Sequence, residues 1–362
     1  MFLMKVGIIT FHFVNNFGGV LQAYAFQNFL TDEFHVECKI IDYRHWFIRL
    51  TDAARRFPLT DPSKCLGPWS HTIGERKERK RKFERFIKKH ENLTKYYRTY
   101  HRLKRNEDEF DLIICGSDQI WNPYLTLGPA KAYYARFADG SVRKISYAAS
   151  VGNPPFFRDR IAGYVRSLDD VSIREQTTWL EDCLEEKPGY NVDPTFLLKR
   201  EKWDSLCSKP VSTEPYILIY LMQSNNEAYD VIQKIQKATG YRTYDISRYG
   251  YNPGFIDKTI VDVGPEDFLG LIKNAAYVCT NSFHGLVFSI IFNKRVSLIP
   301  IKRFSYRIDD LCSMLNAKRI SMEDGRYFEV EYDPVQVDEI MASKRAEAVE
   351  YIKRNINHVQ HQ

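Results

Sequence analysis

The chain has 362 residues, of which 44% are hydrophobic and 27% are charged, and its formal net charge is +6. This length predicts two domains of ordinary size, and the composition is typical of a folded protein rather than a disordered one. No run approaches the roughly 20 apolar residues that cross a bilayer, so we expect no transmembrane helix.

The first predicted element is a strand from Val6 to Phe11, an unbroken apolar run. The N-terminus has no basic segment before this run and no cleavage-site pattern, so we expect a buried strand rather than a signal peptide, and a cytoplasmic location. A loop with Asn16, Gly18 and Gly19 follows, and then a helical run that contains Gln22. A glycine loop before a helix N-terminus can bind an anion through backbone amides, although a plain tight turn would have the same sequence.

A basic segment lies between Glu75 and Arg105, where fourteen Lys or Arg residues accompany four Glu. Phe83, Phe86 and Ile87 have roughly helical spacing, which predicts a basic amphipathic helix. Such a helix is most simply a solvated surface. The alternatives are attraction to anionic lipid head groups or to a polyanionic acceptor. Because no nucleic-acid-binding motif surrounds it, we expect no nucleic-acid partner.

Further apolar strands are predicted at residues 111–115, 144–149 and 171–173, with helices at 158–168 and 175–185. Continuous apolar strands that alternate with helices indicate a parallel sheet buried on both faces. In an open sheet of this kind, ligands bind beyond the carboxyl ends of the strands. The residues that directly follow each strand are therefore the candidates for a site.

Two segments of the first domain meet this criterion. Ser117, Asp118, Trp121 and Asn122 follow one strand, and their density predicts a substrate-facing loop, although helix capping or core packing would explain single members. Arg174 follows the next strand, where its guanidinium could bind a carboxylate or phosphate in a cleft. A surface ion pair with the adjacent Glu175 is the alternative.

A polar segment at 199–215 is predicted to link the two domains, because alternating strands and helices resume at residue 216. We expect an α/β protein with two Rossmann-like domains that face each other across a cleft. The first covers residues 1–200 and includes a basic helical insertion at about 71–105. The second covers residues 214–330, and residues 331–362 form a C-terminal helix for which a return to the first domain is one option.

The second domain has its own candidate turn, in which Asn281, Ser282 and His284 join a predicted strand to a helix. Histidine exchanges protons near neutral pH, and a helix N-terminus both lowers its pKa and attracts an anion. Arg303 and Arg307 follow the last predicted strand and are candidates for anion binding. Solvated charges at a helix start are the alternative for these two.

The motifs together resemble the polysaccharide pyruvyl transferase family, in order and over nearly the whole chain. The matching segments are N-x-G-G-x-L-Q-A-Y-A, D-L-I-I-C-G-S-D-Q-I-W-N-P, S-I-R-E, V-D-P-T and T-N-S-F-H-G. This resemblance implies a glycosyltransferase-B-like fold, phosphoenolpyruvate as the donor substrate, no cofactor, and a hexose or N-acetylhexosamine of a surface polysaccharide as the acceptor. It also implies an arginine two residues before the histidine, where this chain has Ser282 before His284.

The resemblance suggests roles for the candidate residues. Arg174, with Arg303 or Arg307, would hold the donor anions, His284 would move protons, and residues 117–122 would seat the sugar. Whether the acceptor is lipid-linked, and the enzyme therefore peripheral to the membrane, stays open. Two other functions also stay open: a nucleotide-sugar glycosyltransferase on the same fold, and a glycan-binding homologue without activity. The seven cysteines lack C-x-x-C spacing, so we expect no metal site.

Overall fold

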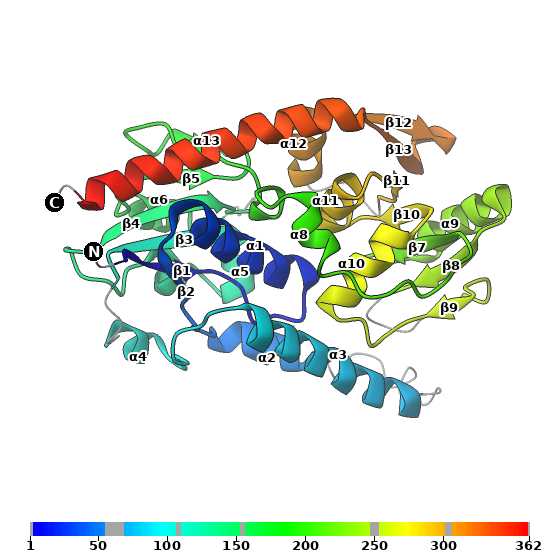
Figure 1. Ribbon diagram of the computed structural model, residues 1–362, viewed down its shortest axis with the longest axis horizontal. Helices are drawn as coiled ribbons and strands as arrows, with labels where there is room; N and C mark the ends of the chain where they lie inside the picture. Colours follow the sequence, from blue (N-terminus) through cyan, green and yellow to red (C-terminus); the bar gives the residue numbers. More distant parts are fainter. Residues whose placement is uncertain are drawn as a thin grey trace. The chain divides into compact units, whose positions relative to one another are not determined.

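The structure is a computed structural model, and it describes residues 3–54, 69–105, 110–152, 156–246, 253–300 and 306–360, without the side chains of 52–54, 69–73 and 324. The chain forms two compact units (Figure 1). Unit 1 consists of Met1–Cys65, Ile87–Leu198 and Ala342–Gln362, and unit 2 of Leu66–Phe86 and Lys199–Met341.

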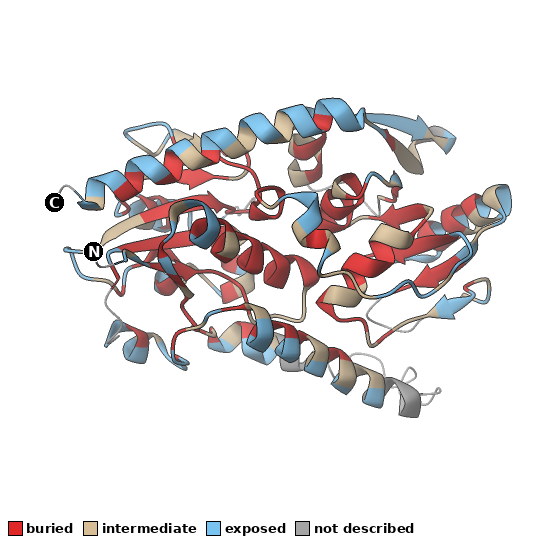
Figure 2. Cartoon of the chain, in the orientation of Figure 1, coloured by how far each residue is buried: buried red, intermediate tan, exposed pale blue. Residues whose placement is uncertain are grey.

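Unit 1 contains a parallel sheet in the order β2-β1-β3-β4-β5-β6. Its strands are β1 (Lys5–Ile9), β2 (Glu37–Ile40), β3 (Leu112–Asp118), β4 (Arg143–Ala149), β5 (Ser172–Ile173) and β6 (Gly189–Tyr190). Its central strands are buried along nearly their whole length, as their apolar sequences predict (Figure 2). The parallel sheet predicted for the first half of the chain is therefore confirmed.

Helices connect these strands and cover the sheet. They are α1 (Phe17–Phe34), α2 (Trp46–Ala54), α4 (Tyr100–Lys104), α5 (Pro123–Thr126), α6 (Arg158–Val165), α7 (Thr178–Glu181), and the 3₁₀ turns η2 (Lys131–Tyr134) and η3 (Pro194–Phe196). The helix predicted over 175–185 was too long, because only α7 forms there. The C-terminal helix α13 (Pro334–Gln360) belongs to unit 1 from Ala342 onward, where Tyr351 Oη donates to Ser146 O at 2.8 Å.

Unit 2 contains a second sheet in the order β12-β13-β11-β10-β7-β8-β9. The strands are β7 (Tyr216–Tyr220), β8 (Arg242–Asp245), β9 (Lys258–Thr259), β10 (Tyr277–Thr280), β11 (Arg295–Leu298), β12 (Lys318–Met322) and β13 (Tyr327–Glu331). Strands β7 to β11 pair in parallel, whereas β13 pairs antiparallel with both β11 and β12. The antiparallel hairpin was not predicted.

The helices of unit 2 are α8 (Arg200–Asp204), α9 (Asn226–Thr239), α10 (Pro265–Asn274), α11 (Phe283–Ile291), α12 (Tyr306–Met314) and the 3₁₀ turn η4 (Glu323–Gly325). Helix α8 lies within the segment predicted as a linker. Its Trp203 is fully buried and meets Phe288 edge-to-face, with ring centroids 5.0 Å apart. This packing explains why unit 2 begins at Lys199 rather than after the polar segment.

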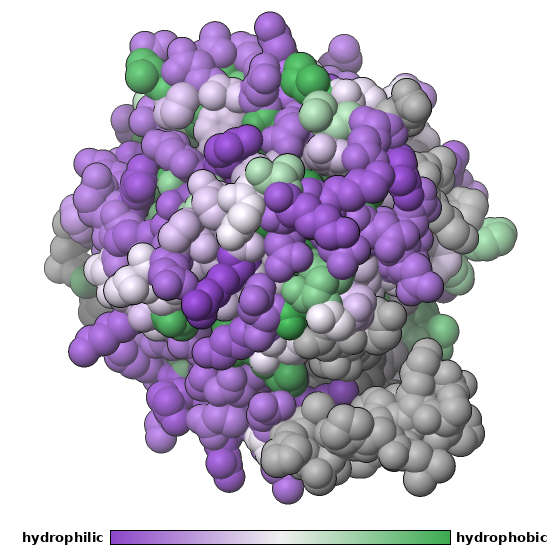
Figure 3. Space-filling model, turned by 90° about the vertical axis from the view of Figure 1, so that its right-hand side faces the viewer, coloured by the Kyte–Doolittle hydropathy of each residue, from purple (hydrophilic) through white to green (hydrophobic). Residues whose placement is uncertain are grey.

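The predicted basic amphipathic helix is present as α3 (Trp69–His90), in which Phe83, Phe86 and Ile87 are buried, but it ends at His90 and does not extend over the predicted range to residue 105. Within unit 2, Lys82 Nζ lies 2.9 Å from a carboxylate oxygen of both Asp262 and Asp267. This cation therefore anchors the helix to unit 2 rather than facing water alone. No helix in the described ranges is long and apolar enough to cross a membrane. Hydrophilic side chains predominate on the face seen in Figure 3.

Candidate functional site

The predicted turn in unit 2 joins β10 to α11 and is held by a short series of hydrogen bonds. Thr280 Oγ1 donates to Tyr220 O at 2.7 Å and accepts from Ser282 N at 3.0 Å. A Cβ on Gly285 would fall within 3.0 Å of the Tyr220 ring and closer still to the Thr280 hydroxyl. Only glycine fits at this position, because the helix begins so close to the neighbouring strand.

Ser282 is the N-cap of α11, and its Oγ accepts a hydrogen bond from Gly285 N at 3.3 Å. The residue is 5% exposed. A serine at this position satisfies one of the backbone amides that the first turn leaves without an internal partner. Ser282 therefore has a local structural role at the position where the family resemblance implies arginine.

His284 lies in the first turn of α11, where the helix dipole is positive. Its ring packs edge-to-face against Phe283, with centroids 5.0 Å apart, and the residue is 6% exposed. The guanidinium carbon of Arg307, from α12, lies 5.4 Å from the centroid of the same Phe283 ring. His284 and Arg307 thus both contact the Phe283 ring. Arg303 lies outside the described residues.

Asn281 connects this turn to the loop after β7. Its Oδ1 accepts from Met222 N at 2.7 Å, and its Nδ2 donates to Gln223 O at 2.8 Å. Both ends of the amide are therefore used to hold two adjacent loops at the carboxyl ends of β7 and β10. We infer that Asn281 positions the turn.

The loop predicted to bind an anion in unit 1 forms the start of α1. Asn16 is the N-cap, and its Oδ1 accepts from Gly18 N at 3.1 Å. A Cβ on Gly19 would lie 2.9 Å from Val14 Cγ2 and 3.0 Å from Phe11 O. Gly19 is thus required by close backbone packing, which explains the glycine without any ligand.

Gln22 connects this loop to the sheet and is fully buried. Its Nε2 donates to Thr10 Oγ1 at 2.9 Å and to Gly19 O at 3.0 Å, and Thr10 Oγ1 in turn donates to Ser117 O at 3.0 Å. No hydrogen-bond partner for Gln22 Oε1 is found among the described residues. This network brings the α1 loop and the end of β3 together.

Asp118, at the end of β3, has a φ of 65°, in the left-handed region that aspartate adopts more readily than most other non-glycine residues. Its carbonyl accepts from Ser150 N at 3.0 Å and from Ile120 N at 2.8 Å. Its side chain is partly exposed, and its Oδ2 lies 3.7 Å from the place where a Cβ on Gly19 would stand. Its partly exposed carboxylate next to the Gly19 loop keeps Asp118 a candidate for substrate contact.

Trp121 and Asn122 have structural roles in this loop. Trp121 is 1% exposed, its Nε1 donates to Tyr133 O at 2.8 Å, and its ring stacks on that of Tyr134 with centroids 5.4 Å apart. Asn122 Oδ1 accepts from Tyr124 N at 3.0 Å and caps α5. Trp121 thus lies in the core, the alternative that its sequence context left open, where no ligand reaches it without rearrangement.

Arg174 lies in a buried ion network rather than with its guanidinium free in a cleft. Its Nη1 donates to Asp193 Oδ2 at 2.7 Å and its Nε to Glu175 Oε2 at 3.3 Å, and its side chain is 5% exposed. Burial lowers the pKa of the Arg174 guanidinium, but the charges of the two carboxylates raise it above its ordinary value. Because the pair with Glu175 is buried, the surface pair considered from sequence is not the arrangement found. Asp193 also accepts from Ser117 Oγ at 3.4 Å.

A polar cluster at the ends of β1 and β2 was not predicted from the sequence. His12 is fully buried, with Nε2 3.0 Å from Asp42 Oδ1 and Nδ1 3.3 Å from Thr10 O. Arg44 donates to both carboxylate oxygens of Asp42, at 2.7 and 2.9 Å. Burial would raise the pKa of Asp42, but the hydrogen bonds from His12 and Arg44 lower it to about 2. The D-x-R spacing after β2 was the available signal.

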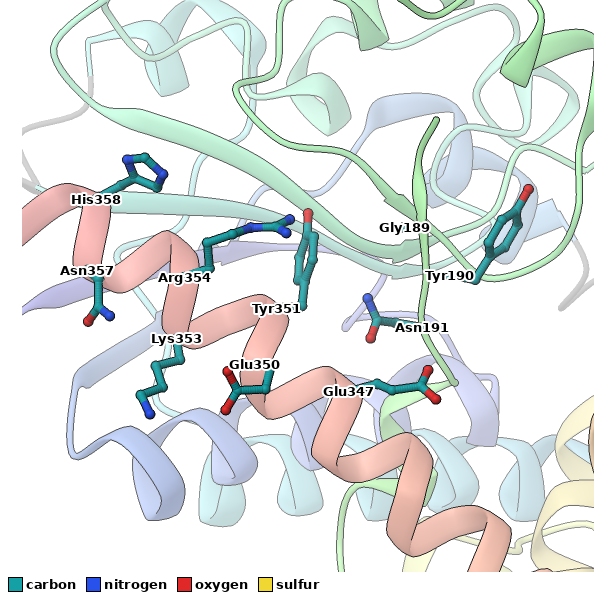
Figure 4. A pocket seen from close by; sticks show the side chains of 10 residues that line it. All are labelled: Gly189, Tyr190, Asn191, Glu347, Glu350, Tyr351, Lys353, Arg354, Asn357 and His358. Carbon is teal, nitrogen blue, oxygen red and sulfur yellow. The ribbon is translucent and has the colours of Figure 1, made fainter. Parts of the chain in front are cut away.

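An open pocket of about 780 Å³ lies elsewhere in unit 1, between β6 and α13 (Figure 4). Tyr190, Glu350, Tyr351 and Arg354 are among its lining residues, and Arg354 is directed toward Tyr351. None of the residues predicted from the sequence lines this pocket. No group of His, Cys, Asp or Glu side chains suited to a metal ion occurs in the part of the chain that the structure describes.

Comparison with solved structures supports the fold. A putative UDP-N-acetylglucosamine 2-epimerase from Listeria monocytogenes has a TM-score of 0.50 and 12% identity, over 87% of this chain and 83% of that one. The S. aureus MnaA–UDP co-structure also has a TM-score of 0.50 and 12% identity, over 98% of this chain and 97% of that one. The E. coli ADP-heptose LPS heptosyltransferase II has a TM-score of 0.39 and 12% identity, over 95% of this chain and 99% of that one. The predicted α/β fold with two Rossmann-like sheets is confirmed.

Comparison with known sequences identifies the family. The family profile described as polysaccharide pyruvyl transferase matches residues 16–302, and no individually curated protein sequence matches the chain. The matched range includes the Asn16 loop, the end of β3, Arg174 and the β10–α11 turn. The chain therefore belongs to the polysaccharide pyruvyl transferase family.

Proposed function

We propose that this member of the polysaccharide pyruvyl transferase family moves a pyruvyl group from phosphoenolpyruvate to a hexose or N-acetylhexosamine of a surface polysaccharide. The observation that supports the proposal is the β10–α11 turn, which lies within the matched range and carries His284 in the first turn of α11, where both His284 and Arg307 contact the Phe283 ring. A helix N-terminus favours a bound anion, and histidine can transfer protons near neutral pH.

The reaction requires one proton at carbon and two attacks by oxygen. A proton is added to the methylene carbon of phosphoenolpyruvate, which leaves an oxocarbenium-like carbon that one sugar hydroxyl attacks. The bond to phosphate then breaks, and a neighbouring hydroxyl closes the cyclic ketal on the same carbon. The two hydroxyls release two protons, one of which balances the proton taken up by carbon while the other leaves with phosphate. The enzyme must therefore hold two anionic groups and two hydroxyls in one place.

In this proposal His284 moves the protons and Arg307 helps to hold the donor anions, in the region where the α11 dipole is positive. Asp118 contacts the sugar at the end of β3, next to the Gly19 loop, whereas Ser117 is fully buried and supports this end of the strand through its hydrogen bond to Asp193. Arg174 acts as a positioning residue, because its ion pair with Asp193 joins the end of β5 to the segment before η3, and Asp193 also accepts from Ser117 in β3. Arg303 remains a candidate for the donor anions.

The presence of Ser282 favours a second candidate function, glycan binding without pyruvyl transfer. This residue stands where the family resemblance implies arginine, and its hydroxyl is already used as a helix cap. A homologue that binds glycans and has lost the transfer reaction would tolerate the absence of that cation. The two functions differ in whether phosphate is released from the donor.

We also propose that the protein works in the cytoplasm and contacts the membrane that carries a lipid-linked acceptor. The outward side of α3 is mainly cationic, and its exposed charged residues are Lys77, Arg81, Glu84, Arg85, Lys88 and Lys89. Glu78 pairs with Arg81 and Arg85, which reduces but does not cancel the positive charge of this side. Attraction to anionic head groups would weaken with salt.

The direct test is incubation of the purified chain with phosphoenolpyruvate and defined saccharide acceptors that offer a pair of neighbouring hydroxyls. We expect phosphate release in equal amount to acceptor that has gained one pyruvylidene group by mass spectrometry. Incubation with UDP-sugars serves as the control for the glycosyltransferase alternative. Saccharide binding without phosphate release from any donor would replace the enzyme proposal with the glycan-binding one.

A further inference from the structure

Helix α2, which follows the edge strand β2, presents large apolar side chains to solvent. Trp46 is 56% exposed and Leu50 is 57% exposed, whereas Ile48 between them is 7% exposed. At 100° per residue, positions 46 and 50 project on the same side of a helix, and position 48 projects on the opposite side. The helix is thus fixed to unit 1 by Ile48, with Trp46 and Leu50 one turn apart on its outward face.

Cationic and aromatic side chains adjoin this face. Arg49 is exposed and shares the outward side of α2, and its guanidinium carbon lies 5.9 Å from the centroid of the Tyr96 ring. Arg44 approaches the same ring at 5.3 Å, and Tyr96 is 44% exposed. Arg44 also pairs with Asp42, so its charge is partly balanced, whereas no ion pair of Arg49 is found among the described residues. Lys95 and Arg98, on either side of Tyr96, are also exposed.

We propose that Trp46, Arg49, Leu50 and Tyr96, which we call the α2 face, insert into the head-group layer of an anionic bilayer. Tryptophan and tyrosine favour this layer because their rings are apolar at one end and polar at the other. Arginine at the same level pairs with lipid phosphate, and an apolar face bordered by cations is typical of helices that lie in the membrane interface. This inference deepens the membrane contact proposed above, since it adds inserted side chains to the electrostatic attraction of α3.

The chemistry and size of the α2 face favour a bilayer over another protein. A stable protein interface buries about 800 Å² on each partner, far more than one tryptophan, one leucine and one tyrosine can supply. A lipid surface needs no complementary shape, and a few inserted side chains together with cations are sufficient for reversible attachment. The occupant that fits is therefore the anionic membrane surface.

The experiment combines vesicle sedimentation with tryptophan fluorescence on the full chain. The vesicles contain phosphatidylcholine alone or phosphatidylcholine with phosphatidylglycerol. We expect binding to the anionic vesicles only, with a blue shift of emission that is absent from Trp46→Phe. Replacement of both apolar residues, in Trp46→Ser/Leu50→Ser, should weaken binding by about tenfold or more, which corresponds to about 1.4 kcal/mol, because the variant loses both inserted apolar side chains. Tyr190→Ser is the matched control, since Tyr190 is 39% exposed on β6, at the opposite edge of the same sheet.

The results of these measurements either support or overturn the proposed insertion of the α2 face. Equal sedimentation of the double variant and the unchanged chain would overturn it and leave an attraction due to charge alone. A shift from dimer to monomer in the double variant, without any vesicle binding by the unchanged chain, would assign the α2 face to a second copy instead. Thermal melts check that the variants fold. Vesicle binding without pyruvyl transfer to a soluble acceptor would contradict the proposed reaction and leave this inference standing.

Discussion

The Ser282 hydroxyl caps α11, and the family resemblance implies a cation at the same position. A substitution here therefore affects both the stability of the helix and the binding of the donor. We expect Ser282→Arg to remove the cap and to lower the free energy of unfolding by about 1 kcal/mol. If the guanidinium has room, charge-assisted hydrogen bonds of about 1.5–3 kcal/mol each should tighten the binding of phosphoenolpyruvate. If Arg307 or Arg303 already occupies that space, donor binding should weaken.

Urea unfolding and donor titration measure these two effects separately. Ser282→Asn is the control, because asparagine is an equally good N-cap and adds no charge. We expect it to leave the stability of the chain within about 0.5 kcal/mol of the original. A Ser282→Arg chain as stable as the original would show that the cap contributes nothing.

His284 can be tested by a change that keeps its size. We expect His284→Asn to lower turnover by at least about 10²-fold while donor affinity changes little, because asparagine can hydrogen bond but cannot transfer a proton near neutral pH. The ring also packs against Phe283, so His284→Phe serves as a second variant that keeps the aromatic contact. Single-turnover kinetics and donor titration give the two quantities. Unchanged turnover in His284→Asn would move the catalytic proton to another group.

Single residues show how far the sequence could predict the candidate site. The polar residues from Ser117 onward indicated a special loop, and the structure places Ser117 and Asp118, the last two residues of β3, beside the α1 loop. The pattern could not reveal that Trp121 lies in the core, since burial depends on contacts with Tyr133 and Tyr134 that are distant in the sequence. Caps, ion networks and ligand-binding loops all use the same polar residue types, so only the geometry distinguishes them.

At the level of elements, the buried Arg174 network joins β5 to the segment that precedes η3. Removal of one partner from a buried ion pair typically costs 3–5 kcal/mol, because the remaining charges stay buried without compensation. We therefore expect Arg174→Met to lower the free energy of unfolding by about 3 kcal/mol or more, since it leaves Glu175 and Asp193 together. Urea unfolding measures this change.

A matched control for the network is Arg354→Met, which breaks the ion pair of Arg354 with Asp170. The Arg354 side chain is 60% exposed, and exposed pairs contribute roughly 0.2–1 kcal/mol. We expect the two arginine variants to differ clearly in their urea midpoints. If the two variants were equally stable, the Arg174 guanidinium would not be needed for the stability of the fold. It would then be available for a direct role with the donor.

The docking of α13 gives a second test at this level. Ile352 is fully buried on the side of the helix that also carries Tyr351, whereas the next residue, Lys353, is exposed. Truncation of a buried isoleucine to alanine lowers the free energy of unfolding by about 2–5 kcal/mol. A substitution on the exposed side of the same helix changes it by no more than about 0.5 kcal/mol. We expect Ile352→Ala to lower the urea midpoint and Lys353→Ala to leave it nearly unchanged. Equal midpoints would mean that this part of α13 is not docked in solution.

The elements also show why part of the fold escaped prediction. Apolar runs such as β3 and β10 are buried on both faces, so their sequences alone indicated parallel strands. The hairpin of β12 and β13 has no such run, because β12 is almost entirely exposed and its residues are mainly polar. The Asp324-Gly325 pair between them was the available signal, since this dipeptide is typical of a hairpin turn. Edge hairpins in contact with water carry little hydrophobic pattern.

For the whole molecule, the decisive question is the donor, because fold similarity to UDP-dependent proteins does not identify what this chain binds. A ligand that binds only the folded chain raises its melting temperature by mass action, and at 100 times the dissociation constant the stabilisation is about 2.7 kcal/mol. We expect phosphoenolpyruvate to raise the melting temperature and UDP, ADP or GDP to leave it unchanged. His284→Asn should keep the shift, since it retains donor binding, whereas Arg307→Ala should reduce it. A shift with UDP alone would favour the glycosyltransferase alternative, and a shift with oligosaccharide alone would favour the glycan-binding one.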